Sequence, residues 1–175
     1  MKGKGHSAAV WLSAKPDLHL VSFDLGSYPY TLQAVTFFGR SHPGRISWVM
    51  GDSTKTVPML RELYGGKCDI LVVDGGHEPG TAQADLLNLR LYARPNFNVM
   101  VMDDVNCSPM EFCRGPEAAL HLLMRRGAAE VFANFSMSFN EGQHMRGFSV
   151  GRFTAGLPAI TLPRSTTAGE QSEGA

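Results

Sequence analysis

The chain has 175 residues, of which 43% are hydrophobic and 18% are charged. These values are typical of a single globular domain and exclude a disordered, collagen-like or membrane-embedded chain. Sixteen basic residues balance sixteen acidic residues, so no net charge attracts nucleic acid or an anionic membrane. No apolar run approaches the roughly 20 residues of a membrane span, and no secretory signal is visible at the start. We therefore expect a cytoplasmic protein that binds neither nucleic acid nor membrane.

The chain alternates between short apolar runs and segments of helical periodicity. Residues 18–23 predict a strand, because this β-rich run ends at Asp24 and turn-forming residues follow it. The apolar residues of 30–40 recur at helical spacing, which predicts a helix. The alternation then repeats, with predicted strands at 45–50, 68–73 and 97–102 and predicted helices at 55–64, 79–92 and 116–126. Apolar strands separated by helices indicate a doubly wound α/β fold with a parallel sheet.

The pattern changes after residue 127. Residues 130–139 and 145–153 are typical of two strands joined by a short turn, which predicts an antiparallel hairpin without an intervening helix. Residues 154–175 carry no periodicity and are rich in Ser, Thr, Gly and Glu. We therefore expect an α/β domain over residues 1–153 and a disordered tail over 154–175.

The cysteines form a sparse and odd-numbered set. Cys68, Cys107 and Cys113 do not describe a disulfide framework, and their spacing matches no zinc pattern. We therefore expect all three to be free thiols.

Acidic residues follow each of the first four predicted strands. The strand ends carry Asp24, Gly51-Asp52-Ser53, Asp74-Gly75-Gly76-His77 and Asp103-Asp104. Ligands bind at the carboxyl ends of strands in an open α/β sheet, so we expect these side chains to line one edge. Clustered carboxylates repel one another unless a cation, a hydrogen-bonding ligand or a raised pKa offsets the repulsion. The edge is therefore a candidate ligand site.

The residues at each strand end can be interpreted as ligand-binding residues or as residues that only stabilise the next turn or helix. Asp24 is placed to accept hydrogen bonds from the hydroxyls of a ribose, although a turn or capping role is the alternative. Asp52 with Ser53 is suited to read a purine edge, but an aspartate after a strand also commonly caps the next helix. The glycine-containing run before the first helix, Gly5-His6-Ser7, suits a ligand that needs backbone N–H groups.

Several of these segments together resemble the class I S-adenosylmethionine-dependent methyltransferases, and more narrowly the branch called methyltransferase domain 24. The resemblance runs from Gly3 to Phe153. Its motifs are Gly-His-Ser-Ala at 5–8, Val-Ser-Phe-Asp-Leu-Gly at 21–26, Gly-Asp-Ser at 51–53 with Thr-Val-Pro at 56–58, Val-Asp-Gly-Gly-His at 73–77, Ala-Asp-Leu at 84–86 and Met-Asp-Asp at 102–104. It implies a Rossmann-like sheet of seven strands with a terminal antiparallel hairpin. The hairpin expected after residue 127 agrees with this fold.

The resemblance also implies roles for individual residues. By position, it assigns the binding of S-adenosylmethionine to Gly5, His6, Ser7, Asp24, Asp52, Ser53 and Asp74. The first three would flank the methionine part of the cofactor, Asp24 would hold the ribose, and Asp52 with Ser53 would face the adenine. Asp74 would lie beneath the sulfonium and the methyl acceptor, which makes it a candidate catalytic residue.

The related cation-dependent O-methyltransferases place one carboxylate after the fourth strand and an acidic pair after the fifth. Asp74, Asp103 and Asp104 match this arrangement, and three hard oxygen ligands suit Mg²⁺ or Ca²⁺. A bound cation would lower the pKa of a substrate hydroxyl. His77 is a candidate catalytic base because the pKa of histidine lies near neutrality, and a purely structural histidine is the alternative.

One part of the family pattern is missing. The family begins with a central strand that ends in an acidic residue and a glycine-rich loop, whereas only Met1 to Lys4 precede Gly5 here. Three explanations are open: the strands that end at Asp24 and Asp74 close the gap, the N-terminus is incomplete, or another chain supplies the strand. We favour an incomplete N-terminus.

The leading functional hypothesis is a methyltransferase that acts on an oxygen, or less readily a nitrogen, of a small molecule. One alternative is a non-catalytic remnant of this fold that only binds ligands. Another is a nicotinamide-dependent oxidoreductase, which would use Asp24 but does not explain the paired acids at 103 and 104. The segment 105–115 is either the border of the acceptor pocket or an ordinary connecting loop. The sequence leaves the acceptor and a homo-oligomeric state open.

Overall fold

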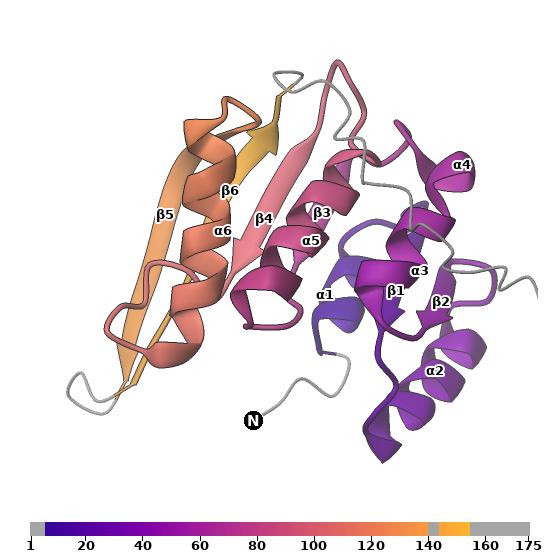
Figure 1. Ribbon diagram of the computed structural model, residues 1–175. Coiled ribbons are helices and arrows are strands. Elements are labelled where there is room, and N and C mark those ends of the chain that lie inside the picture. The colour runs from indigo at the N-terminus through magenta and orange to yellow at the C-terminus, as the bar shows by residue number, and fades with distance from the viewer. Residues whose placement is uncertain (1–5, 140–143, 155–175) are drawn as a thin grey trace, which may run out of the picture.

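A computed structural model describes residues 6–139 and 144–154 of the chain. Its strands lie close to the predicted ranges: β1 Leu20–Asp24, β2 Ile46–Met50, β3 Ile70–Val73, β4 Val99–Asp103, β5 Ala129–Phe139 and β6 His144–Phe153. The helices are α1 His6–Ala14, α2 Pro29–Ser41, α3 Ser53–Met59, α4 Arg61–Tyr64, α5 Pro79–Arg90 and α6 Arg114–Arg125, with a 3₁₀ turn, η1, at Glu111–Cys113. The predicted α/β alternation is confirmed (Figure 1).

The predicted helix at 55–64 is the clearest difference among the helices. It is two shorter helices, α3 and α4, which meet at Leu60. The first begins earlier than predicted because the Asp52 side chain accepts a hydrogen bond from the Thr54 backbone N–H and caps it. Pro58 lies inside its last turn, where it provides no N–H for a helical hydrogen bond. The helix therefore stops at Met59.

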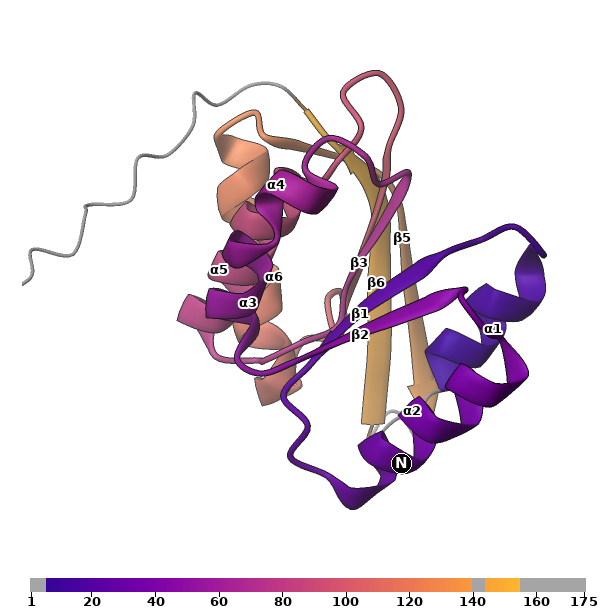
Figure 2. The ribbon, with the colours of Figure 1, turned by 90° about the vertical axis from the view of Figure 1, so that its right-hand side faces the viewer.

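The strands form two sheets. In the first, β1 and β2 pair in parallel; the second has the order β3-β4-β6-β5. β3 and β4 are parallel, whereas β6 is antiparallel to both of its neighbours. The predicted C-terminal hairpin is therefore confirmed. Figure 2 shows α1 and α2 beside the first sheet and α3, α5 and α6 on the other side of the molecule.

The main core lies between the four-stranded sheet and the helices α5 and α6. Alternate residues of β3 and β4 point into it, because successive side chains of a strand face opposite ways. These inward residues meet buried leucines of the two helices, and the set comprises Leu71, Val73, Met100, Met102, Leu86, Leu120 and Leu123. A smaller cluster of Ala8, Leu12 and Phe38 lies where α1 and α2 approach the first sheet. Burial of these apolar side chains stabilises the sheet whose strand ends carry the candidate site.

Within the described residues, no strand joins β1 to β3. β1 and β3 belong to separate sheets, so the explanation that these two strands pair directly is wrong. The side chains of Ile70 and Val72 on β3 are 42% and 37% exposed. One face of β3 is thus open to solvent.

The prediction of three free thiols is wrong for two of the cysteines. Cys107 and Cys113 form a disulfide, while Cys68 is free. The turn that contains η1 brings the Cα atoms of the pair to 6.0 Å, which lies within the normal range for a disulfide. Both cysteines are fully buried. Spacing in the sequence does not reveal this approach, because it depends on the conformation of the intervening loop.

The two ends of the predicted domain are only partly described. The Thr154 backbone N–H donates to the Ala128 carbonyl oxygen, which fastens the end of β6 to the segment after α6. The remainder of the predicted tail, residues 155–175, lies outside the described residues, so the expected disorder stays a prediction. Among the helices of the described ranges, none combines the length and the apolar character that crossing a membrane requires.

Candidate functional site

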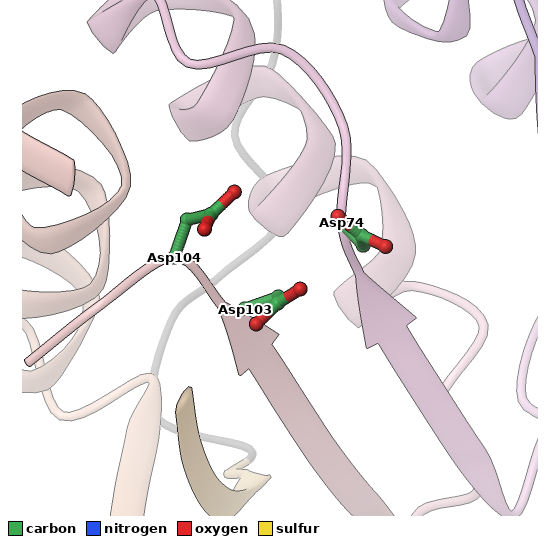
Figure 3. Close-up of side chains that lie close together, drawn as sticks. All are labelled: Asp74, Asp103 and Asp104. Carbon is green, nitrogen blue, oxygen red and sulfur yellow. The ribbon is translucent and has the colours of Figure 1, made fainter. Parts of the chain in front are cut away.

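Three aspartates from neighbouring strand ends gather in one place. Asp74 directly follows β3, Asp103 is the last residue of β4, and Asp104 comes next (Figure 3). One carboxylate oxygen of each lies within 4.8 Å of one from each of the others. They meet because β3 and β4 are parallel and adjacent, with Val73 opposite Met102 in the register. The predicted grouping of these three side chains is therefore confirmed.

Asp74 and Asp103 behave as a coupled pair of acids. Loss of hydration by the Asp74 carboxyl, together with the charges of Asp103 and Asp104, raises its pKa to about 7, although the residue remains open to solvent. Burial also raises the pKa of Asp103, and the charge of Asp104 acts in the same direction. The two carboxyl groups are hydrogen-bonded to each other. Without a cation, the pair therefore retains a proton near neutral pH.

Asp104 differs from the other two acids because positively charged or basic partners hold it. Its Oδ2 lies 2.8 Å from His77 Nε2, and its Oδ1 accepts a hydrogen bond of 2.7 Å from Arg146 Nη1. Its side chain is only 7% exposed. The backbone of Asp104 is left-handed, with φ of 54°, a conformation that aspartate tolerates better than most residues. This turn directs the carboxylate away from the line of β4 and towards the loop after β3.

An aromatic ring completes the surroundings of His77. Phe112 of η1 lies with its ring centroid 5.6 Å from that of His77, and the guanidinium of Arg146 lies 4.5 Å from the Phe112 centroid. His77, Asp104, Arg146 and Phe112 therefore form one connected group. Phe112 belongs to the segment 105–115, for which the sequence left two interpretations open, the border of the acceptor pocket or a connecting loop. Its position beside His77 favours the border of the acceptor pocket.

The other predicted cofactor residues lie on the two-stranded sheet and α3. Asp24 ends β1, and its Oδ1 accepts a hydrogen bond of 2.7 Å from the Gly26 backbone N–H. Asp52 ends the loop after β2 and caps α3 through Thr54. Since β1 and β2 are parallel and paired, Asp24 and Asp52 lie at the same end of this sheet. The capping alternative for Asp52 is therefore correct, and any contact with adenine would be an additional role.

Ser53 contacts a buried acid, Asp85, which belongs to the Ala-Asp-Leu motif of the resemblance but received no predicted role. Its hydroxyl is hydrogen-bonded to Asp85 of α5, and burial raises the pKa of Asp85. A Cβ atom on Gly75 would lie 2.7 Å from Asp85 Oδ2, so glycine lets the loop after β3 pass over this carboxylate. Asp85 therefore connects the beginning of α3 with the loop that carries Asp74 and His77.

The predicted methionine-binding run at the N-terminus is only partly described. His6 begins α1, and Ser7 is exposed in its first turn. Gly5 lies outside the described residues. The proposed roles of these three residues therefore stay predictions.

Arg146 was also missed from the sequence, because no local pattern connects a strand residue with an acid 42 positions earlier. One signal was present. Gly147 follows it in β6, and glycine inside a strand often marks a close approach of two backbones. A Cβ atom on Gly147 would overlap the backbone oxygen of Val105, directly after Asp104. The glycine thus marks the place where β6 approaches the acidic loop.

An α/β sheet that ends in an antiparallel hairpin, with carboxylates at the ends of its parallel strands, is the arrangement that the resemblance to Rossmann-like methyltransferases implies. A model of the methyltransferase domain family, methyltransferase domain 24, matches residues 2–105. The chain belongs to this family. A search among curated proteins finds no match.

Solved structures share this fold at low sequence identity. The O-methyltransferase TomG from Streptomyces achromogenes, in complex with S-adenosylmethionine, superimposes with a TM-score of 0.61 at 19% identity over 86% of this chain and 69% of that one. Cofactor-bound Rv0187 from MTB has a TM-score of 0.61 at 17% identity over 85% and 68% of the two chains. A Burkholderia thailandensis 1,6-didemethyltoxoflavin N1-methyltransferase has a TM-score of 0.52 at 12% identity over 87% and 79%. At these identities the likeness concerns the fold.

Proposed function

We propose that this methyltransferase transfers the methyl group of S-adenosylmethionine to a hydroxyl oxygen of a small molecule, with His77 as the base. The observation that carries the proposal is the hydrogen bond between His77 and the buried Asp104, directly beside Asp74 and Asp103. A histidine oriented by a buried carboxylate can take a proton from a bound hydroxyl. The neutral balance of charge supports a small-molecule acceptor over nucleic acid.

The proposal gives different tasks to the two ring nitrogens of His77. Nε2 faces Asp104 Oδ2 at 2.8 Å, so the neutral ring carries its proton on Nε2 and donates it to the carboxylate. Nδ1 then has the lone pair that accepts the proton of the acceptor hydroxyl. The acceptor oxygen forms a bond to the methyl carbon while the bond from that carbon to sulfur breaks. S-adenosylmethionine supplies the electrophilic methyl group on a positively charged sulfur, and S-adenosylhomocysteine is the second product.

The remaining predicted residues are proposed to hold the cofactor. The Asp24 carboxylate can accept hydrogen bonds from the two ribose hydroxyls, which fits the donor character of a ribose. The start of α3, with Asp52 and Ser53, is proposed to face the adenine. Asp74 is proposed to lie beneath the sulfonium, where a carboxylate complements positive charge.

The acidic cluster also fits a divalent cation. Its three carboxylates converge within 4.8 Å, and the pKa of Asp74 and of Asp103 is raised first by burial and then by the charge of neighbouring acids, both of which a bound cation would offset. Carboxylate oxygens are the ligands that Mg²⁺ and Ca²⁺ prefer. When bound, such an ion lowers the pKa of an adjacent hydroxyl. We propose Asp74 and Asp103 as the principal ligands of the cation. Asp104 is proposed as a third ligand, and one of its oxygens already accepts a hydrogen bond from Arg146.

The direct test of the proposed reaction is turnover by the chain itself. The protein is incubated with S-adenosylmethionine and a panel of small phenols, alcohols and amines, and mass spectrometry detects the methylated products. The proposal expects methylated phenols or alcohols. Methylation of amines alone would indicate a nitrogen acceptor, and binding of S-adenosylhomocysteine without any turnover would support the non-catalytic alternative.

Replacing Asp24 with alanine is expected to weaken the binding of S-adenosylhomocysteine by about 10- to 100-fold, because hydrogen bonds to a charged acceptor contribute about 1.5–3 kcal/mol. Isothermal titration calorimetry measures the change. Asp17→Ala is the matched control, since Asp17 is an exposed aspartate that forms an ion pair with the exposed Lys15. Equal affinities for the two variants would contradict the ribose role.

The binding of Mg²⁺ is expected to strengthen by about tenfold between about pH 6 and pH 8. The Asp74 carboxyl has a pKa of about 7, so a cation must displace its proton below this pH and meets the free carboxylate above it. Calorimetric titrations in buffers with different enthalpies of ionisation measure both the affinity and the number of protons released. Asp74→Asn should bind more weakly with a smaller dependence on pH. Affinity of the unmodified protein that falls as the pH rises would refute this explanation.

Cytoplasmic location and homo-oligomerisation remain predictions. Fractionation of cells that express the tagged chain tests the location. Light scattering of the purified chain measures its mass against 19.0 kDa.

A further inference from the structure

Arg146 is a positive charge placed directly on the acidic cluster. It extends from β6, donates from Nη1 to Asp104 Oδ1 at 2.7 Å, and lies over the ring of Phe112. Its side chain is 59% exposed, whereas the Asp104 side chain is 7% exposed. The guanidinium therefore approaches a buried carboxylate from the solvent side and covers it.

Asp104 has different contacts from Asp74 and Asp103. Its two carboxylate oxygens are used by His77 and Arg146, while Asp74 and Asp103 face each other and share a hydrogen bond. An arginine remains charged at every accessible pH, so it is a permanent cation at this position. A divalent cation in the cluster would share Asp104 with this charge or displace it.

We propose that Arg146 is a built-in competitor of the divalent cation and sets the affinity of the acidic cluster for Mg²⁺ through its ion pair with Asp104. The inference rests on the cation site proposed above. With Arg146 on Asp104, a cation meets two available carboxylates and a nearby positive charge. With Arg146 displaced, it meets three carboxylates. Contact with Phe112 favours the first state because the ring and the guanidinium attract each other.

The chain offers a closely matched control for this arginine. Arg152 lies on the same strand, pairs with Glu130 at 2.7 Å, and has its guanidinium 5.7 Å from the ring centroid of Phe132. Its side chain is 54% exposed. Arg152 therefore has the same kinds of contact as Arg146, but its carboxylate partner is not a member of the acidic cluster.

The test is calorimetric titration of Mg²⁺ into the full chain and its variants. Arg146→Met is expected to tighten binding by about tenfold or more, because a unit charge a few ångströms from the ion is removed. Arg146→Lys should change the affinity for Mg²⁺ less. Arg152→Met should leave the affinity within about twofold of that of the unmodified protein. Arg146→Gln replaces the methionine variant if thermal denaturation shows that the latter is unfolded. An affinity of Arg146→Met or Arg146→Gln equal to that of Arg152→Met would overturn the proposal.

A double-mutant cycle tests whether the effect passes through Asp104. In an Asp104→Asn background, removal of the Arg146 charge should tighten Mg²⁺ binding by a smaller factor than in the unmodified protein. An undiminished factor would overturn the ion-pair mechanism. Binding of S-adenosylhomocysteine is measured in parallel. If no variant binds Mg²⁺ while the cofactor product still binds, the inference about Arg146 fails and the methyltransferase function stands, whereas loss of product binding by the unmodified chain counts against the proposed function itself.

Discussion

Replacement of His77 by glutamine is expected to lower kcat by about two to four orders of magnitude, the range that general base catalysis contributes. The imidazole is the group that the buried Asp104 holds beside the acidic cluster. Glutamine has a similar length and polarity but no basic nitrogen. The rate is measured with whichever phenol or alcohol of the panel gives the most methylated product.

The binding of S-adenosylhomocysteine separates a loss of chemistry from a loss of structure. It should be nearly the same in His77→Gln and in the unmodified protein, because His77 is proposed to act on the acceptor and not on the cofactor. His121→Gln is a suitable control, since His121 is an exposed histidine on α6. A fall in kcat no larger for His77→Gln than for His121→Gln would remove His77 from the mechanism and favour its structural interpretation.

Gly115→Ala is expected to destabilise the protein by about 1–3 kcal/mol, the usual effect of forcing an added group into a packed interior. Gly115 is buried in the first turn of α6, against the loop that follows His77. A Cβ atom at this position would overlap the backbone oxygen of His77 and lie 3.0 Å from the Pro79 nitrogen. Both neighbours are backbone atoms, so the overlap can be relieved only by moving the loop or the helix.

The same displacement should reduce kcat by about tenfold or more, because a shift of about 1 Å in a catalytic group can cost a large factor in rate. Gly80→Ala is the control, since nothing lies within 4 Å of a Cβ atom added there. Alanine is also the better helix former, so this variant should be as stable as the unmodified protein or more stable. Urea denaturation compares the two. Similar stability and similar kcat for both variants would show that the contact between Gly115 and His77 does not position the loop.

Sequence predictions that rest on local periodicity were correct, whereas those that depend on the conformation of a particular loop or turn were not. Strands and helices were placed within a few residues because apolar periodicity is a local property. The helix predicted at 55–64 begins earlier because Asp52 caps it, and it is interrupted at Leu60, two residues after Pro58. The cysteine prediction failed because six residues of separation permit a disulfide only for some loop conformations, and the loop before α6 adopts one of them.

In the candidate site, the residues at strand ends were predicted, but contacts between elements distant in the sequence were not. Asp74, Asp103 and Asp104 were predicted together because each follows a strand, and parallel neighbouring strands bring their carboxyl ends to one edge. Asp85 stands in the Ala-Asp-Leu motif, but its contact with Ser53 was not predicted, because an acid among the buried positions of a helix gives no sign of its partner. Arg146 was overlooked because its ion pair with Asp104 spans 42 positions and depends on β6 lying next to β4.

The α/β order, the terminal hairpin, the family and the carboxylates at the strand ends can all be recognised in the amino-acid sequence alone. Each of these follows from short-range pattern or from motifs that stand in a fixed order along the chain. Three further features depend on the three-dimensional fold: β1 and β3 do not pair with each other, Cys107 and Cys113 form a disulfide, and Asp104 lies between His77 and Arg146. These contacts depend on which strands and loops become neighbours in space, a choice made by packing of the whole core.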